Sequence, residues 1–339
     1  MKRTTLALTL LAFAAAVAPG SWAGAEANPD DPGDAGAGAA HGAPGPALES
    51  DPVVLETALD CPEGLRRPDQ NVVLLVHGTA TTAAETWPSG LGRVLTDAGF
   101  DWCTVQLPGR ALVDIQQSAE HVVAAVRSLN RRTGRKVSIV GHSQGALQPR
   151  WAVRWWPDVR AGVDDLITIA GANREIPWTR AAFCNPSCAP PIWQFSTGAN
   201  FMRALNAVPM PAGPSYTTIR SHTDNLIQPS LPDGMAVATI EGAVNVAVQD
   251  LCPGRVVEHA GLVFDAVALA VVLDALTHPE AAADPARVGD ANCAQVYATG
   301  IDPVVATAAV TGIYLNAFPA VATTSQVDSE PPLRAYAKD

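Results

Sequence analysis

The stretch Val137-Ser138-Ile139-Val140-Gly141-His142-Ser143-Gln144-Gly145 decides the fold of this chain. Its first four residues are mostly β-branched and predict a buried strand, and the residues after Gly145 are typical of a helix. A serine between two glycines at a strand-to-helix turn lies on a sharp, strained bend, where bulkier neighbours would clash. Such a bend lifts the hydroxyl above the sheet. We therefore predict that Ser143 is a nucleophile, and not simply a serine in a glycine-flanked loop.

Strands and helices are predicted to alternate along most of the chain. The run Asn71–Val76 has the length and the continuous apolar character of a strand buried on both faces. Alternation of strands with helices predicts a mostly parallel sheet flanked by helices on both faces. This is the α/β-hydrolase fold of the α/β class. We expect one such domain over residues 51–322 and a C-terminal tail over 323–339. The other predicted strands are 102–107, 136–140, 165–170 and 216–220.

Two helices next to these strands carry specific predictions. Asp114 and Gln117 form a capping-box pattern, and Gly134 is placed to end the same helix. A second helix is predicted over residues 144–156, where Pro149 should remove one hydrogen bond and kink the helix. The apolar residues of the first helix share one face, at Ile115, Ala119, Val122, Val126 and Leu129.

The N-terminal residues 1–25 have the features of a secretory signal peptide. Lys2 and Arg3 precede the apolar run Leu6–Val17, which is too short to span a bilayer. Small residues offer cleavage sites nearby, and no cysteine is present there for a lipid anchor. Residues 26–50 are rich in Ala, Gly, Pro and Asp and predict a flexible leader. We therefore expect a secreted protein without a stable membrane anchor.

The charge balance excludes some classes of partner. The formal net charge is −11, which argues against nucleic acid and against adsorption to anionic lipid. Hydrophobic residues make up 48% of the chain and charged residues 16%. That balance fits an apolar cleft or a lipid–water interface, and equally a well-packed core, so it does not decide between them.

The six cysteines are expected to pair, since the chain is predicted to be secreted. The sequence alone allows many connectivities. Cys184 and Cys188 are close enough for a local disulfide, and the nearest-neighbour choice for the rest is Cys61–Cys103 and Cys252–Cys293. Zinc binding is the competing interpretation, but no Cys/His cluster has the spacing of zinc ligands.

A serine nucleophile needs a histidine that takes its proton. In this fold the chain order is serine, acid, histidine, so the candidates are His222, His259 and His278. His278 follows a probable helix and is expected to face solvent, whereas His222 lies beside a strand end and could compete. His259 ends a short apolar run before the long apolar helix predicted over 262–276. We predict that His259 is the base.

The acid that orients the histidine is predicted to be Asp224. It lies in a polar turn directly after the strand at 216–220. Glu258 is adjacent to His259, and neighbouring side chains in an extended run point to opposite faces, so it is a poor partner. Asp250 and Asp265 remain as weaker alternatives.

The oxyanion hole requires two N–H groups aimed at the developing negative charge. One is expected from Gln144, which follows the nucleophile, and the other from Thr79 on the loop after the strand at 71–76. The Thr79 hydroxyl could add a further donor. His77 and His142 flank these donors, and we expect both to hydrogen-bond locally and not to take part in the chemistry.

These motifs together resemble the family of Candida antarctica lipase B-like lipases and their bacterial relatives. The similarity runs from about Cys61 to about Phe318, through LLVHGTATT at 74–82, SQG at 143–145 and APPIWQFSTG at 189–198. Acid-loop and histidine-loop stretches at 221–229 and 257–261 continue it in the same order.

This resemblance implies roles for individual residues. Ser143, Asp224 and His259 correspond to the family's catalytic triad, and Thr79 and Gln144 to its oxyanion donors. It implies the disulfides Cys61–Cys103 and Cys252–Cys293, no cofactor and no metal. The helix predicted over 303–318 resembles a helix that walls the pocket entrance. The implied pocket residues are His142, Asn173, Trp193 and Gln194; His142 and Asn173 replace a tryptophan and an aspartate of the yeast enzyme.

The leading functional hypothesis is a secreted, monomeric serine lipase or carboxylesterase acting on lipid or small ester substrates. A polyester hydrolase or an acyltransferase would use the same residues. A non-catalytic binding module with a hydrolase-like fold is the alternative from another class. Such modules usually lack the serine or the histidine, whereas this chain has both.

Overall fold

The computed structural model describes residues 43–67, 69–230 and 236–338. The chain divides into two units, Met1–Gly38 and Ala39–Asp339. The first unit lies outside the described residues, and so do the predicted signal peptide and residues 26–42 of the predicted leader.

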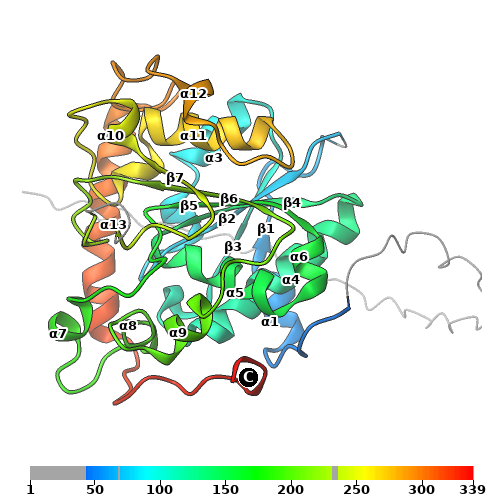
Figure 1. Cartoon of the computed structure of the whole chain (residues 1–339), viewed down its shortest axis with the longest axis vertical. Helices are drawn as coiled ribbons and strands as arrows, with labels where there is room; N and C mark the ends of the chain where they lie inside the picture. Colours follow the sequence, from blue (N-terminus) through cyan, green and yellow to red (C-terminus); the bar gives the residue numbers. More distant parts are fainter. Residues whose placement is uncertain (1–42, 68, 231–235, 339) are drawn as a thin grey trace, which may run out of the picture. The chain divides into compact units, whose positions relative to one another are not determined.

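A seven-stranded sheet in the order β1-β3-β2-β4-β5-β6-β7 forms the centre of the second unit (Figure 1). Every neighbouring pair is parallel except β1 with β3. The predicted α/β-hydrolase architecture is confirmed, with the five predicted strands as β2 to β6. The strands are β1 (Leu59–Asp60), β2 (Val72–Val76), β3 (Trp102–Val105), β4 (Val137–His142), β5 (Val163–Ile169), β6 (Ser215–Arg220) and β7 (Val244–Ala247).

Helices cover both faces of this sheet (Figure 1). Val72, Leu74 and Val76 of β2 pack into the core beside α4 and α5, while Val73 and Leu75 pack into the core beside α3 and α11. Successive residues of a strand point to opposite faces, which is why the whole run is apolar. The helices that make these two layers are α3 (Leu91–Asp97), α4 (Ile115–Thr133), α5 (Leu147–Trp155), α6 (Pro157–Ala161) and α11 (Ala266–Thr277).

Shorter elements connect these layers. Further α-helices are α1 (Pro52–Thr57), α2 (Ala83–Thr86), α7 (Thr179–Phe183), α8 (Pro190–Gln194), α9 (Asn200–Asn206), α10 (Val248–Leu251), α12 (Pro285–Val288) and α13 (Pro303–Thr323). The 3₁₀ turns are η1 (Pro108–Ala111), η2 (Ser143–Ala146), η4 (Gly261–Val263) and η5 (Ala335–Ala337).

Helix α4 forms for the predicted reasons, with one difference at its start. Its predicted apolar face is fully buried, and Gly134 ends the helix in the left-handed conformation at φ 67°. Asp114 caps the first turn by accepting a hydrogen bond from the backbone N–H of Gln116 at 2.9 Å. The side chain that returns to this cap is Gln116 and not Gln117, so the predicted capping box is wrong.

The structure does not show the single helix predicted over residues 144–156. The segment divides into η2 and α5, so Pro149 is the third residue of α5. The N–H groups of a first helical turn have no partner within the helix, so proline removes no hydrogen bond there.

Residues on both sides of the predicted range 51–322 belong to the packed domain. The Trp156 indole N–H donates to the backbone carbonyl of Pro46 at 2.8 Å. Near the C-terminus, the Tyr336 hydroxyl accepts from the Trp151 indole N–H at 3.1 Å. Pro46 and Tyr336 therefore contact two tryptophans, Trp156 and Trp151, which lie directly after α5 and within it.

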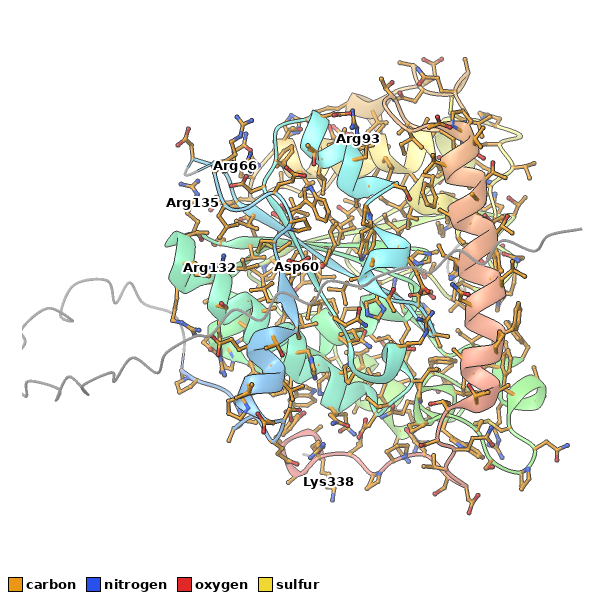
Figure 2. All side chains as sticks on the ribbon, turned by 180° about the vertical axis from the view of Figure 1, so that it is seen from behind. Asp60, Arg66, Arg93, Arg132, Arg135 and Lys338 are labelled. Atoms are coloured by element: carbon orange, nitrogen blue, oxygen red, sulfur yellow. A yellow bond between two sulfur atoms is a disulfide. The ribbon has the colours of Figure 1, made fainter. Side chains whose placement is uncertain are left out.

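Lysine is rare in this chain, with Lys136 and Lys338 the two in the described residues. Lys136 directly precedes β4, so it lies at the amino end of the strand whose carboxyl end leads to Ser143. Its Nζ is 3.5 Å from an oxygen of Asp164. Lys338 follows η5 (Figure 2).

Three disulfides join Cys61 to Cys103, Cys184 to Cys188 and Cys252 to Cys293. The predicted pairing is confirmed. The partners are 42, 4 and 41 residues apart in the sequence, respectively. A cross-link that closes a longer loop restricts the unfolded chain more.

Removing the Cys252–Cys293 disulfide is therefore expected to destabilise the protein more than removing Cys184–Cys188. The chain-entropy relation gives losses of about 4 and about 2 kcal/mol in the free energy of unfolding. The measurement is urea unfolding of the double alanine variants under non-reducing conditions. Equal losses in the two variants would contradict the loop-length argument.

Candidate active site

The candidate site lies at the carboxyl ends of the parallel strands. Ser143 follows β4, Thr79 lies on the loop after β2, and Asp224 lies on the loop after β6. His259 lies between α10 and η4, beyond β7. Because these strands are parallel, their carboxyl ends share one edge of the sheet, which is where ligands bind in such folds.

Ser143 has the strained backbone that its motif predicts. Its φ angle is 58°, which lies in the left-handed region that residues other than glycine rarely adopt. The flanking glycines make the bend possible by allowing close approach. A Cβ on Gly141 would lie 2.2 Å from the Gly145 carbonyl oxygen, and one on Gly145 would lie 2.3 Å from the Val76 carbonyl oxygen.

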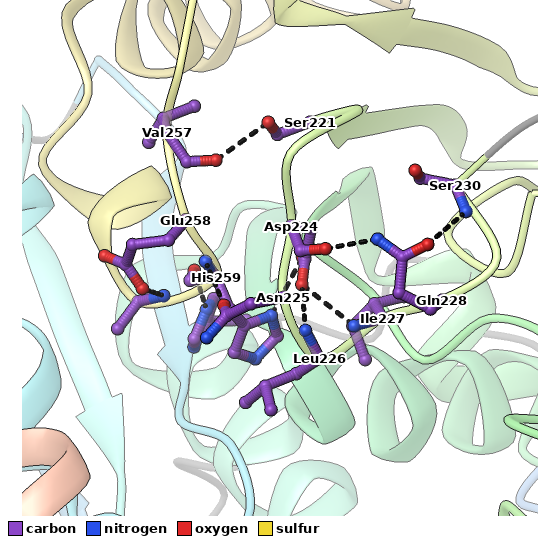
Figure 3. A network of polar contacts seen from close by, with 12 residues as sticks. Ser221, Asp224, Asn225, Leu226, Ile227, Gln228, Ser230, Val257, Glu258 and His259 are labelled. Atoms are coloured by element: carbon purple, nitrogen blue, oxygen red, sulfur yellow. Dashed lines mark hydrogen bonds and ion pairs between the residues drawn. The ribbon is translucent and has the colours of Figure 1, made fainter. Parts of the chain in front are cut away.

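Asp224 and His259 form a buried hydrogen-bonded pair (Figure 3). His259 Nδ1 is 2.9 Å from Asp224 Oδ2. A carboxylate only accepts, so Nδ1 carries the proton and Nε2 keeps its lone pair. The other oxygen of Asp224 accepts from the N–H groups of Leu226 and Ile227, both at 2.8 Å. Burial opposes ionisation, but His259 and these two N–H groups hold the pKa of Asp224 below its ordinary value.

The other candidate acids form hydrogen bonds or ion pairs with residues other than His259. Glu258 contacts the Tyr314 hydroxyl and accepts from the N–H of Ala260. Asp250 accepts from the N–H of Ala247 before α10. Asp265 caps α11 and pairs with Arg255 at 2.7 Å. The structure thus brings Asp224, and none of the weaker candidates, to His259.

The other candidate bases lie away from the pair. His278 is half-exposed at the end of α11, 3.6 Å from Asp274. His222 shares the loop of Asp224, where its backbone N–H donates to Gln249 at 3.0 Å. Neither histidine lines the cavity that contains Ser143 and His259.

The two predicted oxyanion residues lie together beside Ser143. The Thr79 hydroxyl donates to Gln144 Oε1 at 2.5 Å, so that hydroxyl is occupied by the Gln144 side chain. Gln144 Nε2 donates in turn to the Ala111 carbonyl at 3.1 Å. A Cβ on Gly78 would lie 2.9 Å from Ser143 Cβ, which shows how closely the loop approaches the serine.

An apolar cavity opens at these residues. Ser143, His259, Thr79, Gln144 and His142 line it. The remaining lining is mainly hydrophobic, including Ile176, Trp178, Phe183, Ile192, Phe195, Leu226, Ile227, Ile313, Ala317, Phe318 and Val321.

Three of the four predicted pocket residues do not line this cavity. Asn173 donates to Thr168 Oγ1 and to the Ala238 carbonyl, at 3.0 and 2.8 Å. Gln194 accepts from the N–H of Ile115 and donates to Asp114, which binds it to the start of α4. Trp193 donates to the Val327 carbonyl. Their polar groups form hydrogen bonds within the protein, and of the four residues only His142 lines the cavity.

Helix α13 forms one wall of the cavity (Figure 2). It is the one helix among the described residues that is long and apolar enough to cross a membrane, and most of its residues are not buried. Polar contacts hold it against the domain. The Tyr314 hydroxyl bonds Glu258 and Asn225, and Asn316 Nδ2 donates to Glu85 at 3.0 Å. Leu315 of this helix is exposed, and Phe318, which lines the cavity, is also exposed.

His77 and His142 are both buried and neutral. His77 Nε2 accepts from the N–H of Leu107 at 3.0 Å, and its Nδ1 donates to the carbonyl of Gly78. Burial lowers the pKa of His77 to about 4. Burial, and then the nearby His259, lower the pKa of His142 to about 3. The local hydrogen bond predicted for His142 is wrong, because its Nε2 contacts the His259 carbonyl.

Comparison with known proteins places this geometry in a family. The model of the family described as lipase (class 2) matches residues 70–253, more than half of the chain. The chain belongs to the class 2 lipase family. Lipase B of Pseudozyma antarctica is 28% identical over 301 residues, 86% of this chain and 86% of that protein. The crystal structure of Aspergillus fumigatus lipase B has a TM-score of 0.81 at 28% identity, over 87% of this chain and 74% of that one. The resemblance to lipase B-type proteins is confirmed.

In the part of this class 2 lipase that the structure describes, there is no group of three or more His, Cys, Asp or Glu side chains that could hold a metal ion.

Acid is expected to destabilise this class 2 lipase through His77 and His142. Each stays neutral when folded, whereas the unfolded state takes up a proton below its ordinary pKa of about 6.5. Each histidine therefore lowers the free energy of unfolding by about 1.4 kcal/mol for every pH unit below that value, down to its folded pKa.

The measurement is urea unfolding between about pH 7 and pH 4. In His142→Gln the loss of free energy of unfolding per pH unit should be smaller by about 1.4 kcal/mol, the contribution of one proton. Parallel curves for the wild type and His142→Gln would contradict the assignment of a neutral, buried His142.

Proposed function

We propose that this protein is a secreted serine carboxylic ester hydrolase, a lipase or carboxylesterase, that works through an acyl-enzyme on Ser143. The observation that carries the proposal is the buried pair of Asp224 and His259 at the same cavity as Ser143. Membership of the class 2 lipase family supports an ester as the substrate.

The proposed reaction follows from the tautomer of His259. With its proton on Nδ1, the bare Nε2 takes the proton of Ser143 as Oγ attacks the ester carbonyl. His259 then gives that proton to the leaving alkoxide, and the alcohol departs. Water repeats the sequence on the acyl-serine and releases the acid. Asp224 stays ionised throughout and stabilises the imidazolium.

We assign the stabilisation of the developing oxyanion to the backbone N–H groups of Gln144 and Thr79. The Gln144 side chain bonds Thr79 on one side and the Ala111 carbonyl on the other. This arrangement holds the two donor segments at a fixed separation before substrate arrives. Preorganised donors of this kind often make the largest single contribution to the rate enhancement of acyl transfer.

The cavity supports an apolar acyl group as substrate. Its walls are mainly aliphatic and aromatic, so a hydrocarbon chain loses water on entry without leaving buried polar groups unpaired. Helix α13 belongs to this proposal as a wall of the pocket and not as a membrane span. Tyr314 donates a hydrogen bond to Glu258, directly before His259, and Asn316 donates one to Glu85 of α2.

Secretion is also part of the proposal. The positively charged start and apolar run of residues 2–17 support it, and so do the three disulfides. A single copy of the chain contributes Ser143, Asp224 and His259, so a monomer suffices for the reaction.

Ser143→Ala and His259→Ala are each expected to reduce ester hydrolysis by about 10⁴- to 10⁶-fold with the fold retained. Asp224→Asn should lower kcat strongly because it disturbs the tautomer of His259. The assay is hydrolysis of a short p-nitrophenyl ester, with the melting temperature measured in parallel. His278→Ala, at an exposed position, is the control and should keep its activity. Turnover near that of the wild type in His259→Ala, with loss in His222→Ala, would reverse the assignment of the base.

The substrate class is tested on the purified enzyme with long-chain triacylglycerol, short soluble esters and polyester film, each with and without an alcohol acceptor. We expect hydrolysis of the first two, in line with the apolar cavity. Preferential attack on the film would indicate a polyester hydrolase, and ester formation in water would indicate an acyltransferase. Loss of all activity with an intact fold would indicate a binding module.

A further inference from the structure

His259 is held by more than its bond to Asp224. Its backbone N–H donates to Asn225 Oδ1 at 3.1 Å (Figure 3), and its backbone carbonyl lies 3.1 Å from His142 Nε2. Residues 255–258, directly before it, have no regular secondary structure. Two side chains therefore supply the hydrogen bonds that a helix or a strand would otherwise provide.

His142 can only donate in this contact. A carbonyl oxygen has no proton to give, so His142 Nε2 must carry one. Its Nδ1 is buried and has no hydrogen-bond partner, which is consistent with a bare lone pair. The His142 side chain is therefore a neutral donor, fixed in one tautomer. It neither competes with His259 for the serine proton nor adds positive charge beside it.

The two imidazole rings are also in contact. Their centroids are 4.7 Å apart, with the ring planes tilted by 39°. His142 is 3% exposed and His259 is 5% exposed, so this ring contact is shielded from solvent. His142 is also the last residue of β4 and directly precedes Ser143.

We propose that His142 is a positioning residue that fixes the base relative to the nucleophile. It joins the strand that carries Ser143 to the irregular segment that carries His259, through one hydrogen bond and one ring contact. This inference rests on the proposed function, because it assumes that His259 is the base. A displacement of about 1 Å between reacting groups can cost about 100-fold in rate, so a single such link matters.

Two substitutions separate the hydrogen bond from the packing. His142→Gln retains an N–H donor at about the position of Nε2, whereas His142→Phe fills the space without a donor. We expect kcat on a short p-nitrophenyl ester to fall by about 10- to 100-fold in His142→Phe and to stay within a few-fold of the wild type in His142→Gln. His121→Phe removes another buried histidine, on α4, and should leave kcat unchanged.

A second readout does not depend on turnover. The proton shared by His259 Nδ1 and Asp224 should give a low-field NMR resonance in the wild type and in His142→Gln. It should broaden or disappear in His142→Phe, because His259 becomes mobile. A merely structural role for His142 would lower the melting temperatures of both variants and leave this resonance intact in the folded fraction.

The outcomes distinguish this inference from the proposed function. If the wild type hydrolyses esters, and His142→Phe keeps its kcat and its resonance, the positioning role is wrong and the proposed function stands. Equal losses of kcat in the Gln and Phe variants would also overturn the role of the hydrogen bond. If the wild type hydrolyses no ester, the proposed function fails, and the resonance still decides whether His142 fixes His259.

Discussion

The close approach of Gly145 to the end of β2 is the constraint on which the site depends. Because the Gly145 backbone lies against the Val76 carbonyl, the turn after β4 is pressed onto the neighbouring strand. Ser143 has its left-handed conformation in this turn, and the hydrogen bond from Thr79 to Gln144 joins the loop after β2 to the same turn. The strain is sustained by a sheet whose central strands are fully buried, and a large core can hold such a conformation.

The central fold was accessible from the sequence because its signals are local. A continuous apolar run defined β2, short stretches rich in apolar and β-branched residues defined β3 to β6, and Asp114 with Gly134 defined the two ends of α4. β7 was missed because Val244–Ala247 is short and interrupted by Asn245. The order serine, acid, histidine also identified Asp224 and His259, which the structure joins across 35 residues.

The pocket was much less predictable, because its lining depends on how distant side chains satisfy their polar groups. Asn173 turns towards Thr168 and Ala238, a choice that only the packed structure reveals. Apolar residues of α8 and α13 form the walls instead, and composition alone cannot distinguish them from core residues. The bond from His142 to His259 spans 117 residues and leaves no local signal in the sequence.

The scarcity of lysine has a practical consequence for attaching this protein to a solid support. Lys136 lies at the amino end of β4, seven residues before Ser143, which corresponds to roughly 20 Å along an extended strand. A support that couples through the amine of Lys136 would hold the domain by the edge of the sheet opposite the cavity. Molecules attached through this amine would then present their binding face to the surrounding liquid.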